Sequence, residues 1–318
     1  MTKFETADRH WSLVTAASQK TKLVTDINLV LGQSNAGGSQ PSPIEVPATI
    51  TGPGVAWGVR RSASPELNGT LLSPFQNGAN HTTHFGASSW SPPFAQRWYD
   101  LTGRSSLWAN LAFAGTPLVG AAIPGADHWA VSPWESSLIG ASTLGVELPR
   151  NIILGDVFEA HRINPLFGDG LRLVHWIQGE ADANSVALDR LGQDDYAEEL
   201  DFLFSYLKRT YAIDHFLIYE LGRKGTTLAE VQANEAQWQG YMEIRAAQNS
   251  VAALRADTFM IFTGAKETGT PFNTLTVDAS GYHVSGFSYM ADGVHFDSAS
   301  HTAMGLTAAR NLSQLLGL

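Results

Sequence analysis

Short apolar runs alternate along the chain with longer segments whose apolar residues recur at helical spacing. The runs indicate five strands, at 27–31, 107–113, 171–177, 216–221 and 258–262. The helical segments are 93–101, 153–162, 194–211, 228–249 and 298–316, the last with Ser298 as its expected N-cap. Such alternation is typical of a sheet covered by helices on both faces. We therefore expect an α/β protein, a three-layer α/β/α sandwich with a mostly parallel five-stranded sheet.

Two segments interrupt this alternation, 39–89 and 115–149, and both are rich in Gly, Pro, Ser, Asn and Trp. We predict long, ordered surface loops there. Because each follows a strand, both loops should emerge at the sheet edge where α/β proteins bind ligands. The candidate chemical residues are spread from position 34 to position 295. We therefore expect one domain over 27–318 that carries both loops as insertions, preceded by a polar extension at 1–26.

The charge balance narrows the class of partner. Thirty acidic and 20 basic residues give a net charge of −10, which disfavours nucleic acid as a partner. The chain has no cysteine, so disulfides, thiolate chemistry and cysteine-based zinc sites are excluded. Neither a signal-peptide core nor the roughly 20 apolar residues of a membrane span is visible. We therefore expect no membrane span. The compartment stays open: the protein can be cytoplasmic, or it can be secreted or virion-associated after loss of a leader. The oligomeric state stays open as well.

Ser34 follows the first apolar run directly, within Gly32-Gln33-Ser34-Asn35. A serine at the mouth of a first strand is well placed to act as the nucleophile of a hydrolase. A base is available in His295, because Asp292, three residues earlier, can hold one ring nitrogen and leave the other free to accept a proton. Taken alone, an Asp-x-x-His pair also describes a surface turn with a hydrogen-bonded histidine.

A third polar segment follows the strand at 171–177. The side-chain amide of Gln178 can donate a hydrogen bond to a developing oxyanion. Glu180 can contact the histidine, tie down a loop or cap the next segment, and the residues leave this choice open. The backbone N–H of Gly86 can serve the same oxyanion, although a glycine that ends a loop before a helix needs no catalytic explanation.

In their order and separations, these segments resemble the four conserved blocks of the SGNH hydrolases. The narrower resemblance is to the branch that is sialate O-acetylesterase-like and acetylxylan-esterase-like, because Gln178-Gly179-Glu180 replaces an asparagine block. It spans about residues 27 to 310. Two departures are Ala36, where the branch commonly has methionine, and the Gly86 block, which lacks the usual Gly-Pro-Glu form.

The resemblance implies a flavodoxin-like fold and a serine esterase that needs neither a metal nor an organic cofactor. It implies Ser34 as nucleophile, His295 as general base and Asp292 as the partner of that base, with Glu180 as the rival to Asp292. The implied oxyanion donors are the backbone N–H groups of Ser34 and Gly86 and the side chain of Gln178.

The expected reaction is removal of O-acetyl groups from polysaccharide, xylan or sialic-acid-type substrates through an acyl-enzyme. Gln33 and Asn35 are predicted substrate contacts, and Trp129 and Trp134 are the preferred walls for stacking on a sugar, although a packing role is the commoner one for any single tryptophan. Two alternatives remain: a short-chain lipolytic or thioester hydrolase, and a glycan-binding or virion-associated module with little turnover.

Overall fold

The computed structural model describes residues 22–38, 51–52, 54–60, 70–72, 89–123, 126–131, 157–186, 192–233, 235–267 and 271–318. Within these ranges seven strands form one sheet in the order β3-β2-β4-β1-β5-β6-β7. The strands are β1 (Leu23–Gly32), β2 (Ala56–Arg60), β3 (Thr70–Leu72), β4 (Ser105–Asn110), β5 (Phe167–Ile177), β6 (His215–Tyr219) and β7 (Thr258–Phe262). A separate pair, β8 (Thr276–Val277) and β9 (His283–Ser285), lies outside this sheet.

Every pairing in the main sheet is parallel except that of β3 with β2. The predicted mostly parallel α/β/α architecture is therefore confirmed. The predicted five strands correspond to β1, β4, β5, β6 and β7, and the structure adds β2 and β3 within segment 39–89, which was predicted as a loop. β2 escaped detection because it is short, contains Gly58 and follows a glycine-rich turn, so its local composition is that of a loop.

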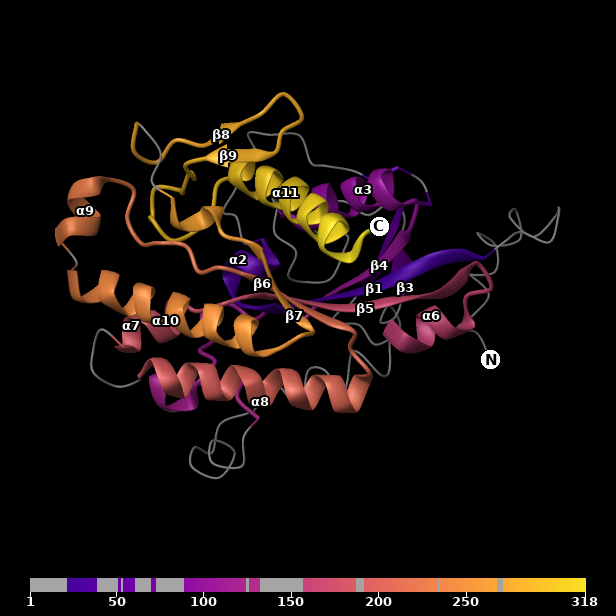
Figure 1. Cartoon of the computed structure of the whole chain (residues 1–318), viewed down its shortest axis with the longest axis horizontal. Helices are drawn as coiled ribbons and strands as arrows, with labels where there is room; N and C mark the ends of the chain where they lie inside the picture. The colour runs from indigo at the N-terminus through magenta and orange to yellow at the C-terminus, as the bar shows by residue number, and fades with distance from the viewer. Residues whose placement is uncertain are drawn as a thin grey trace.

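Helices cover both faces of the sheet (Figure 1). α3 (Ser91–Thr102) and α11 (Ser298–Leu316) pack together on one face. The other face carries α6 (Glu159–Ile163), α7 (Glu180–Val186), α8 (Gln193–Tyr211) and α10 (Glu235–Leu254), with α9 (Leu228–Ala233) preceding α10. The predicted helix 228–249 is thus two helices. The N-cap of α11 is Asp297, whose carboxylate accepts the N–H of Ser300 at 2.7 Å, and not Ser298 as expected.

Each face of the sheet has its own apolar core. The core under α3 and α11 is strongly aromatic and encloses His175, which lies among Trp90, Phe94 and Trp108. Burial lowers the pKa of His175 to about 3. Its ring nitrogens lie 2.9 Å from Oδ1 of Asn28 and 3.0 Å from the hydroxyl of Tyr219. His175 is therefore a neutral, hydrogen-bonded core residue.

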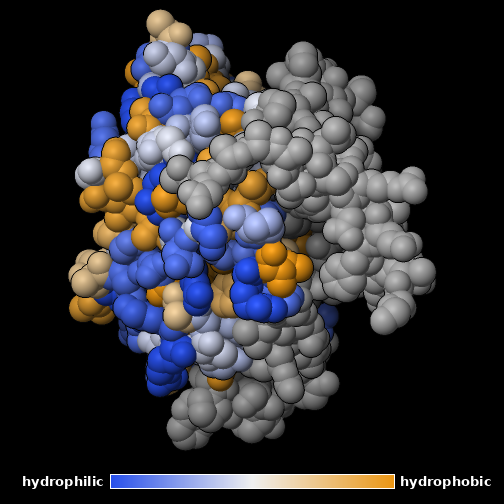
Figure 2. Space-filling view, turned by 90° about the vertical axis from the view of Figure 1, so that its right-hand side faces the viewer, coloured by the Kyte–Doolittle hydropathy of each residue, from blue (hydrophilic) through white to orange (hydrophobic). Residues whose placement is uncertain are grey.

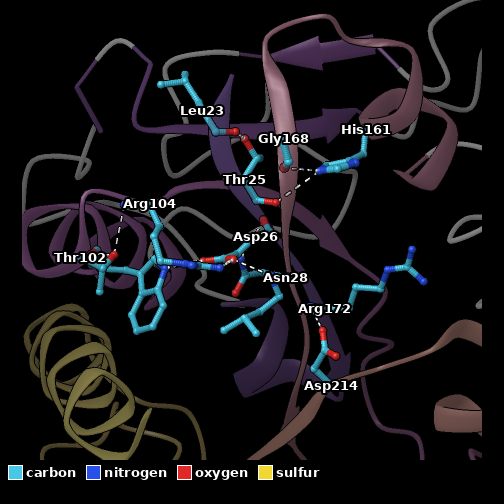
Figure 3. Close-up of polar contacts among 12 residues, drawn as sticks. Leu23, Thr25, Asp26, Asn28, Thr102, Arg104, His161, Gly168, Arg172 and Asp214 are labelled. Atoms are coloured by element: carbon cyan, nitrogen blue, oxygen red, sulfur yellow. Dashed lines mark hydrogen bonds and ion pairs between the residues drawn. The ribbon is translucent and has the colours of Figure 1, made fainter. Parts of the chain in front are cut away.

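A buried carboxylate, that of Asp26, lies at the edge of the sheet where the strands begin (Figure 3). It accepts hydrogen bonds from Nε of Arg104 at 2.9 Å, from the indole of Trp98 at 2.8 Å and from the backbone N–H of Leu171 at 2.6 Å. On the surface at this end, hydrophilic and hydrophobic residues are intermixed in the coloured part of Figure 2. The hydrogen bonds of Asp26 join β1 to α3, to the residue before β4 and to β5. The candidate catalytic residues lie at the opposite edge of the sheet, where the strands end.

Within the described ranges, every helix is too short or too polar to span a lipid bilayer.

Candidate active site

Ser34 begins α2 (Ser34–Gly37), a short helix directly after β1. The turn depends on Gly32, whose φ is +127° and where an added Cβ would collide with the carbonyl oxygen of Ile177 in β5. Only glycine fits such a position. The backbone N–H of Gln33 then donates to the same carbonyl at 3.1 Å. Gln33 and Asn35 are buried on either side, so Ser34 is the partly exposed residue of this turn.

His295 lies on the loop between β9 and α11, together with Asp292. Nδ1 of His295 is 2.7 Å from Oδ2 of Asp292, and Oδ1 of Asp292 accepts the backbone N–H groups of Val294 and His295 at 2.9 and 3.0 Å. Partial burial acts to raise the pKa of Asp292, but the hydrogen bonds from the His295 ring and from the two N–H groups lower it overall. Asp292 is therefore an ionised carboxylate that orients the imidazole.

Asn35 joins the Ser34 turn to the His295 loop. Its amide nitrogen donates to the carbonyl oxygen of Val294 at 3.1 Å, and its amide oxygen accepts the N–H of Phe296 at 3.2 Å. These are the residues on either side of His295. One side chain next to Ser34 thus fixes the backbone that carries the histidine.

Asn35 and Gln33 are both buried in this structure, and their role as substrate contacts stays a prediction. Their side chains are turned into the protein, where they bond to other site residues. The polar residues that flank Ser34 therefore lie within the candidate site, as the sequence indicated.

Glu180, the first residue of α7, is buried and joins the group through Asn35. Its Oε1 accepts the Asn35 amide at 2.7 Å. Burial raises the pKa of Glu180, while the hydrogen bond from Asn35 and the proximity of His295 act in the opposite sense. The direct carboxylate partner of the His295 ring in this geometry is Asp292, and Glu180 stands behind Asn35.

Gln178 is buried at the end of β5, and its amide is fully engaged inside the protein. The nitrogen donates to Asp182, to the carbonyl of Thr116 at 3.2 Å and to Oε1 of Gln33 at 3.4 Å, and the oxygen accepts the hydroxyl of Tyr196 at 2.9 Å. An amide nitrogen carries only two hydrogens. The geometry therefore differs from the predicted oxyanion donor, because the protein already supplies three acceptors to that nitrogen.

Asp182 is a site residue that the sequence did not single out. Its buried carboxylate accepts the N–H groups of Leu118 and Val119 at 2.9 and 3.0 Å, as well as the Gln178 amide. Burial raises the pKa of Asp182 to about 6 against the opposing effect of these hydrogen bonds. The carboxylate ties the segment that follows β4 to the turn between β5 and α7, next to Gln178.

The His295 loop is held by a hydrogen-bonded cluster of three residues, Arg223, Asn273 and Tyr289. The sequence pattern did not predict this cluster. The buried Arg223 guanidinium donates to Oδ1 of Asn273 at 3.0 Å, and its backbone N–H donates to the Tyr289 hydroxyl at 2.9 Å. Asn273 bonds both the N–H and the carbonyl of Tyr289, at 2.8 and 3.2 Å. Tyr289 in turn bridges to Phe296, next to His295.

The remaining predicted site residues are Trp129, Gly86 and Trp134. Trp129 is fully buried, donates from its indole to the Thr116 hydroxyl at 2.9 Å and packs edge-on against Trp176, so its predicted role as a sugar-stacking wall is wrong. Gly86 and Trp134 lie outside the described residues. Ala36 is buried, and its carbonyl accepts the indole N–H of Trp90 at 3.2 Å.

The fold and the site define a three-layer α/β protein whose polar groups gather at the carboxyl edge of a parallel sheet, where such proteins bind ligands. No family model matches the sequence, and no curated protein matches it either. Among solved structures the chain is similar to NanS, with a TM-score of 0.53 and 14% identity over 94% of this chain and 100% of that one. The chain thus has the fold that its resemblance to SGNH hydrolases implied.

Two further solved structures are more distant. One is a carbohydrate esterase family 2 enzyme with a carbohydrate-binding domain from Corynascus thermopiles (Myceliophthora fergusii), with a TM-score of 0.44 and 12% identity over 95% of this chain and 69% of that one. The other is Axe2, an acetylxylan esterase from Geobacillus stearothermophilus, with a TM-score of 0.41 and 9% identity over 94% and 97% of the two chains.

Proposed function

We propose that this protein is a serine esterase that removes O-acetyl groups from carbohydrate. The observation that carries the proposal is the contact of 2.7 Å between His295 and Asp292, on a loop that Asn35 fastens to the Ser34 turn. A carboxylate on one ring nitrogen leaves the other nitrogen to act as a base. This support is geometric and holds whichever ester is the natural one.

In the proposed mechanism, Nε2 of His295 removes the proton of the Ser34 hydroxyl as its oxygen attacks the ester carbonyl. The imidazolium then returns that proton to the departing sugar hydroxyl, and the acetyl group stays on Ser34. Water activated by His295 releases acetate and restores the enzyme. The backbone N–H groups of Ser34 and Gly86 are the proposed oxyanion donors, each contributing about 3 kcal/mol to the transition state.

Acetylated carbohydrate is proposed as the substrate on two grounds. The sequence blocks around Ser34, Gln178 and His295 resemble those of the branch that acts on acetylated sugars. In addition, the side chains of His295 and Asp292 remain 28% and 45% exposed within the described part of the chain. A base this open to solvent suits an ester on a bulky sugar better than one at the end of an acyl tunnel.

Acetate release from acetylated xylan, acetylated sialic acids and acetylated bacterial polysaccharide tests the proposal. A parallel series of nitrophenyl esters with acyl chains of increasing length tests the acyl preference. We expect acetate release from at least one polymer or sugar and a steep fall in rate beyond the acetyl ester. Rates that rise with chain length would identify a lipolytic or thioester hydrolase, and glycan binding without acetate release would identify a binding module.

A further inference from the structure

The ring of Tyr282 is in contact with two arginine side chains that come from different helices. The guanidinium carbon of Arg97, on α3, lies 5.1 Å from the centre of this ring, and that of Arg310, on α11, lies 4.2 Å from it. α3 and α11 pack together, and α11 also contacts β9, which begins at the residue after Tyr282 (Figure 1). Two positive charges therefore meet at one aromatic ring.

The backbone on both sides of Tyr282 is held by hydrogen bonds. The N–H of Tyr282 donates to Oδ1 of Asp278 at 3.1 Å, and its carbonyl accepts the N–H of Asp278 at 3.0 Å. The next residue, His283, donates its N–H to the hydroxyl of Thr307 in α11 at 2.8 Å. The ring of Tyr282 is therefore fixed relative to α11, which carries one of the two arginines.

The polar groups around this ring have unused hydrogen-bonding capacity. Within the described part of the chain, neither Arg97 nor Arg310 forms a side-chain hydrogen bond or an ion pair. Nε of Arg97 and the hydroxyl of Tyr282 are both buried and unpartnered there, and Tyr282 is only 6% exposed. Buried donors in folded proteins are nearly always paired, and a guanidinium carries five N–H donors. These groups are therefore available to a ligand that accepts hydrogen bonds.

The carboxylates on neighbouring elements do not neutralise the two arginines. Asp100, three residues after Arg97 on α3, accepts the side-chain amide of Gln96 at 2.8 Å. Asp278 accepts the backbone N–H of Tyr282, and α11 contains neither aspartate nor glutamate. In a chain of net charge −10, the two arginines thus form a local region of positive charge.

This region is separate from the candidate active site. Arg310 lies far along α11 from its first residue, Ser298, at a distance of about 18 Å for a rise of 1.5 Å per residue. His295 precedes that first residue. A ligand bound to Arg97 and Arg310 would therefore lie away from an ester bound at Ser34.

We propose that Arg97, Arg310 and Tyr282 form a binding site for a tetrahedral oxyanion, a phosphate or a sulfate group. The two guanidinium groups donate N–H groups to the oxygens of the anion, with the geometry that arginine uses for phosphate, and the hydroxyl of Tyr282 donates a further hydrogen bond. Two positive charges match the two negative charges of such an anion. This inference does not depend on the proposed function.

Thermal unfolding in inorganic phosphate, with the ionic strength held constant by NaCl, tests the inference. We expect a Kd on the order of 1 mM, so that about 50 mM phosphate raises the Tm by about 2–4 °C. Arg97→Gln and Arg310→Gln should each weaken binding at least about tenfold and remove most of this increase. Tyr282→Phe keeps the ring that both guanidinium groups contact, and it should weaken binding about threefold through loss of the hydroxyl.

The Tm increase is measured within each variant, so a change in the stability of the variant itself does not affect the comparison. Isothermal titration calorimetry with phosphate measures the same affinities directly.

Arg172→Gln is the matched control. The guanidinium of Arg172 also lies over an aromatic ring, 4.5 Å from the centre of Phe158, but it donates to the carbonyl of Tyr211 at 2.9 Å. This variant loses the same charge and should keep the phosphate effect of the wild type. The inference would be overturned by an equal Tm increase in Arg97→Gln, Arg310→Gln and the control, or by no increase in the wild type.

Dextran sulfate and neutral dextran distinguish a free anion from the same group on a polymer. Dextran sulfate that binds more tightly than inorganic sulfate, and that loses affinity in Arg97→Gln and Arg310→Gln, would support the site and assign it to a polymer. Dextran sulfate that binds no more tightly than inorganic sulfate, with the same dependence on the two arginines, would support the site and assign it to the free ion. Equal binding of sulfate to the wild type and both variants would contradict the inference.

Discussion

The side-chain amide of Asn35 donates a hydrogen bond of 2.7 Å to Glu180, and both residues are buried. The same amide nitrogen also donates to the carbonyl of Val294, one residue before His295. Asn35 therefore connects three segments that are far apart in the chain: the turn after β1, the start of α7 and the loop before α11. The alignment of the proposed nucleophile and base depends on this one side chain.

Asn35→Ala should lower kcat for nitrophenyl acetate with little change in KM, because the His295 loop loses its attachment to the Ser34 turn. The N–H of Phe296 and the carboxyl of Glu180 lose a partner, so the free energy of unfolding should fall by about 1–3 kcal/mol. Steady-state kinetics and urea unfolding measure the two effects.

Asn249→Ala is the matched control for Asn35→Ala. Asn249 also donates its amide to a buried glutamate, Glu220, at 2.9 Å, but it does so from α10. We expect a smaller loss of stability, because Asn249 is itself exposed, and an unchanged kcat. Equal kcat values in the two variants would show that Asn35 has no positioning role.

Asp292→Asn and Glu180→Gln compare the two carboxylates. Asp292 contacts the His295 ring at 2.7 Å, so its loss should lower kcat about 10³- to 10⁴-fold by removing the acceptor that fixes the ring tautomer. Glu180→Gln keeps an oxygen for the Asn35 amide and should have a much smaller effect. The reverse order of kcat values would assign the role to Glu180.

The raised pKa of Asp182 predicts that the free energy of unfolding depends on pH. Its pKa is about 6 in the folded protein against an ordinary value of 3.8, so between these values the folded state holds more protons than the unfolded state. Stability contributed by this group is therefore present below pH 4 and declines as the pH rises through 6, by on the order of 3 kcal/mol. Asp182→Asn removes this dependence, because an amide does not titrate.

Urea unfolding of the wild type and Asp182→Asn at several pH values from 4 to 7 measures this effect. The free energy of unfolding of the wild type minus that of the variant should decrease with pH over this range. A constant difference would mean that the folded protein does not raise the pKa of Asp182.

The Asp26 network predicts a stability effect without a catalytic one. Asp26→Asn leaves the Arg104 guanidinium next to an uncharged amide at the edge where the strands begin (Figure 3). We expect the free energy of unfolding to fall by about 3 kcal/mol, as for other broken buried ion pairs. The kcat/KM of the folded fraction should stay at the wild-type value, and a large loss of kcat/KM would contradict the placement of the site at the opposite edge.

The local pattern of apolar and polar residues was sufficient to predict some helices and strands and insufficient for others. The bounds of β7 and α11 agree with the prediction because each has a clear apolar period and a clear end. β2 was missed because its place beside β4 is a property of the sheet and not of its own composition. Trp129 was misread because an indole serves equally well in a core and in a sugar site.

In the candidate site, too, contacts between residues close in sequence could be predicted, and contacts between distant residues could not. Asp292 and His295 are three residues apart, so their contact could be predicted from spacing alone. Asn35 reaches Phe296 across 261 positions, and Asp182 reaches Leu118 across 64, and no local pattern reports such contacts. The role of Gln178 as an oxyanion donor stays a prediction, and the acceptors of its amide, Thr116 and Asp182, could not be predicted because only the fold brings them to it.

Covalent labelling of Ser34 tests the central claim most directly. The protein is treated with a fluorophosphonate, the modified residue is located by peptide mass spectrometry, and acetate release is followed in parallel. We predict one label on Ser34 with complete loss of acetate release, no labelling in Ser34→Ala, slow labelling in His295→Ala, and wild-type behaviour in Ser205→Ala, a serine on α8. A label on another serine, or acetate release retained in Ser34→Ala, would contradict the account.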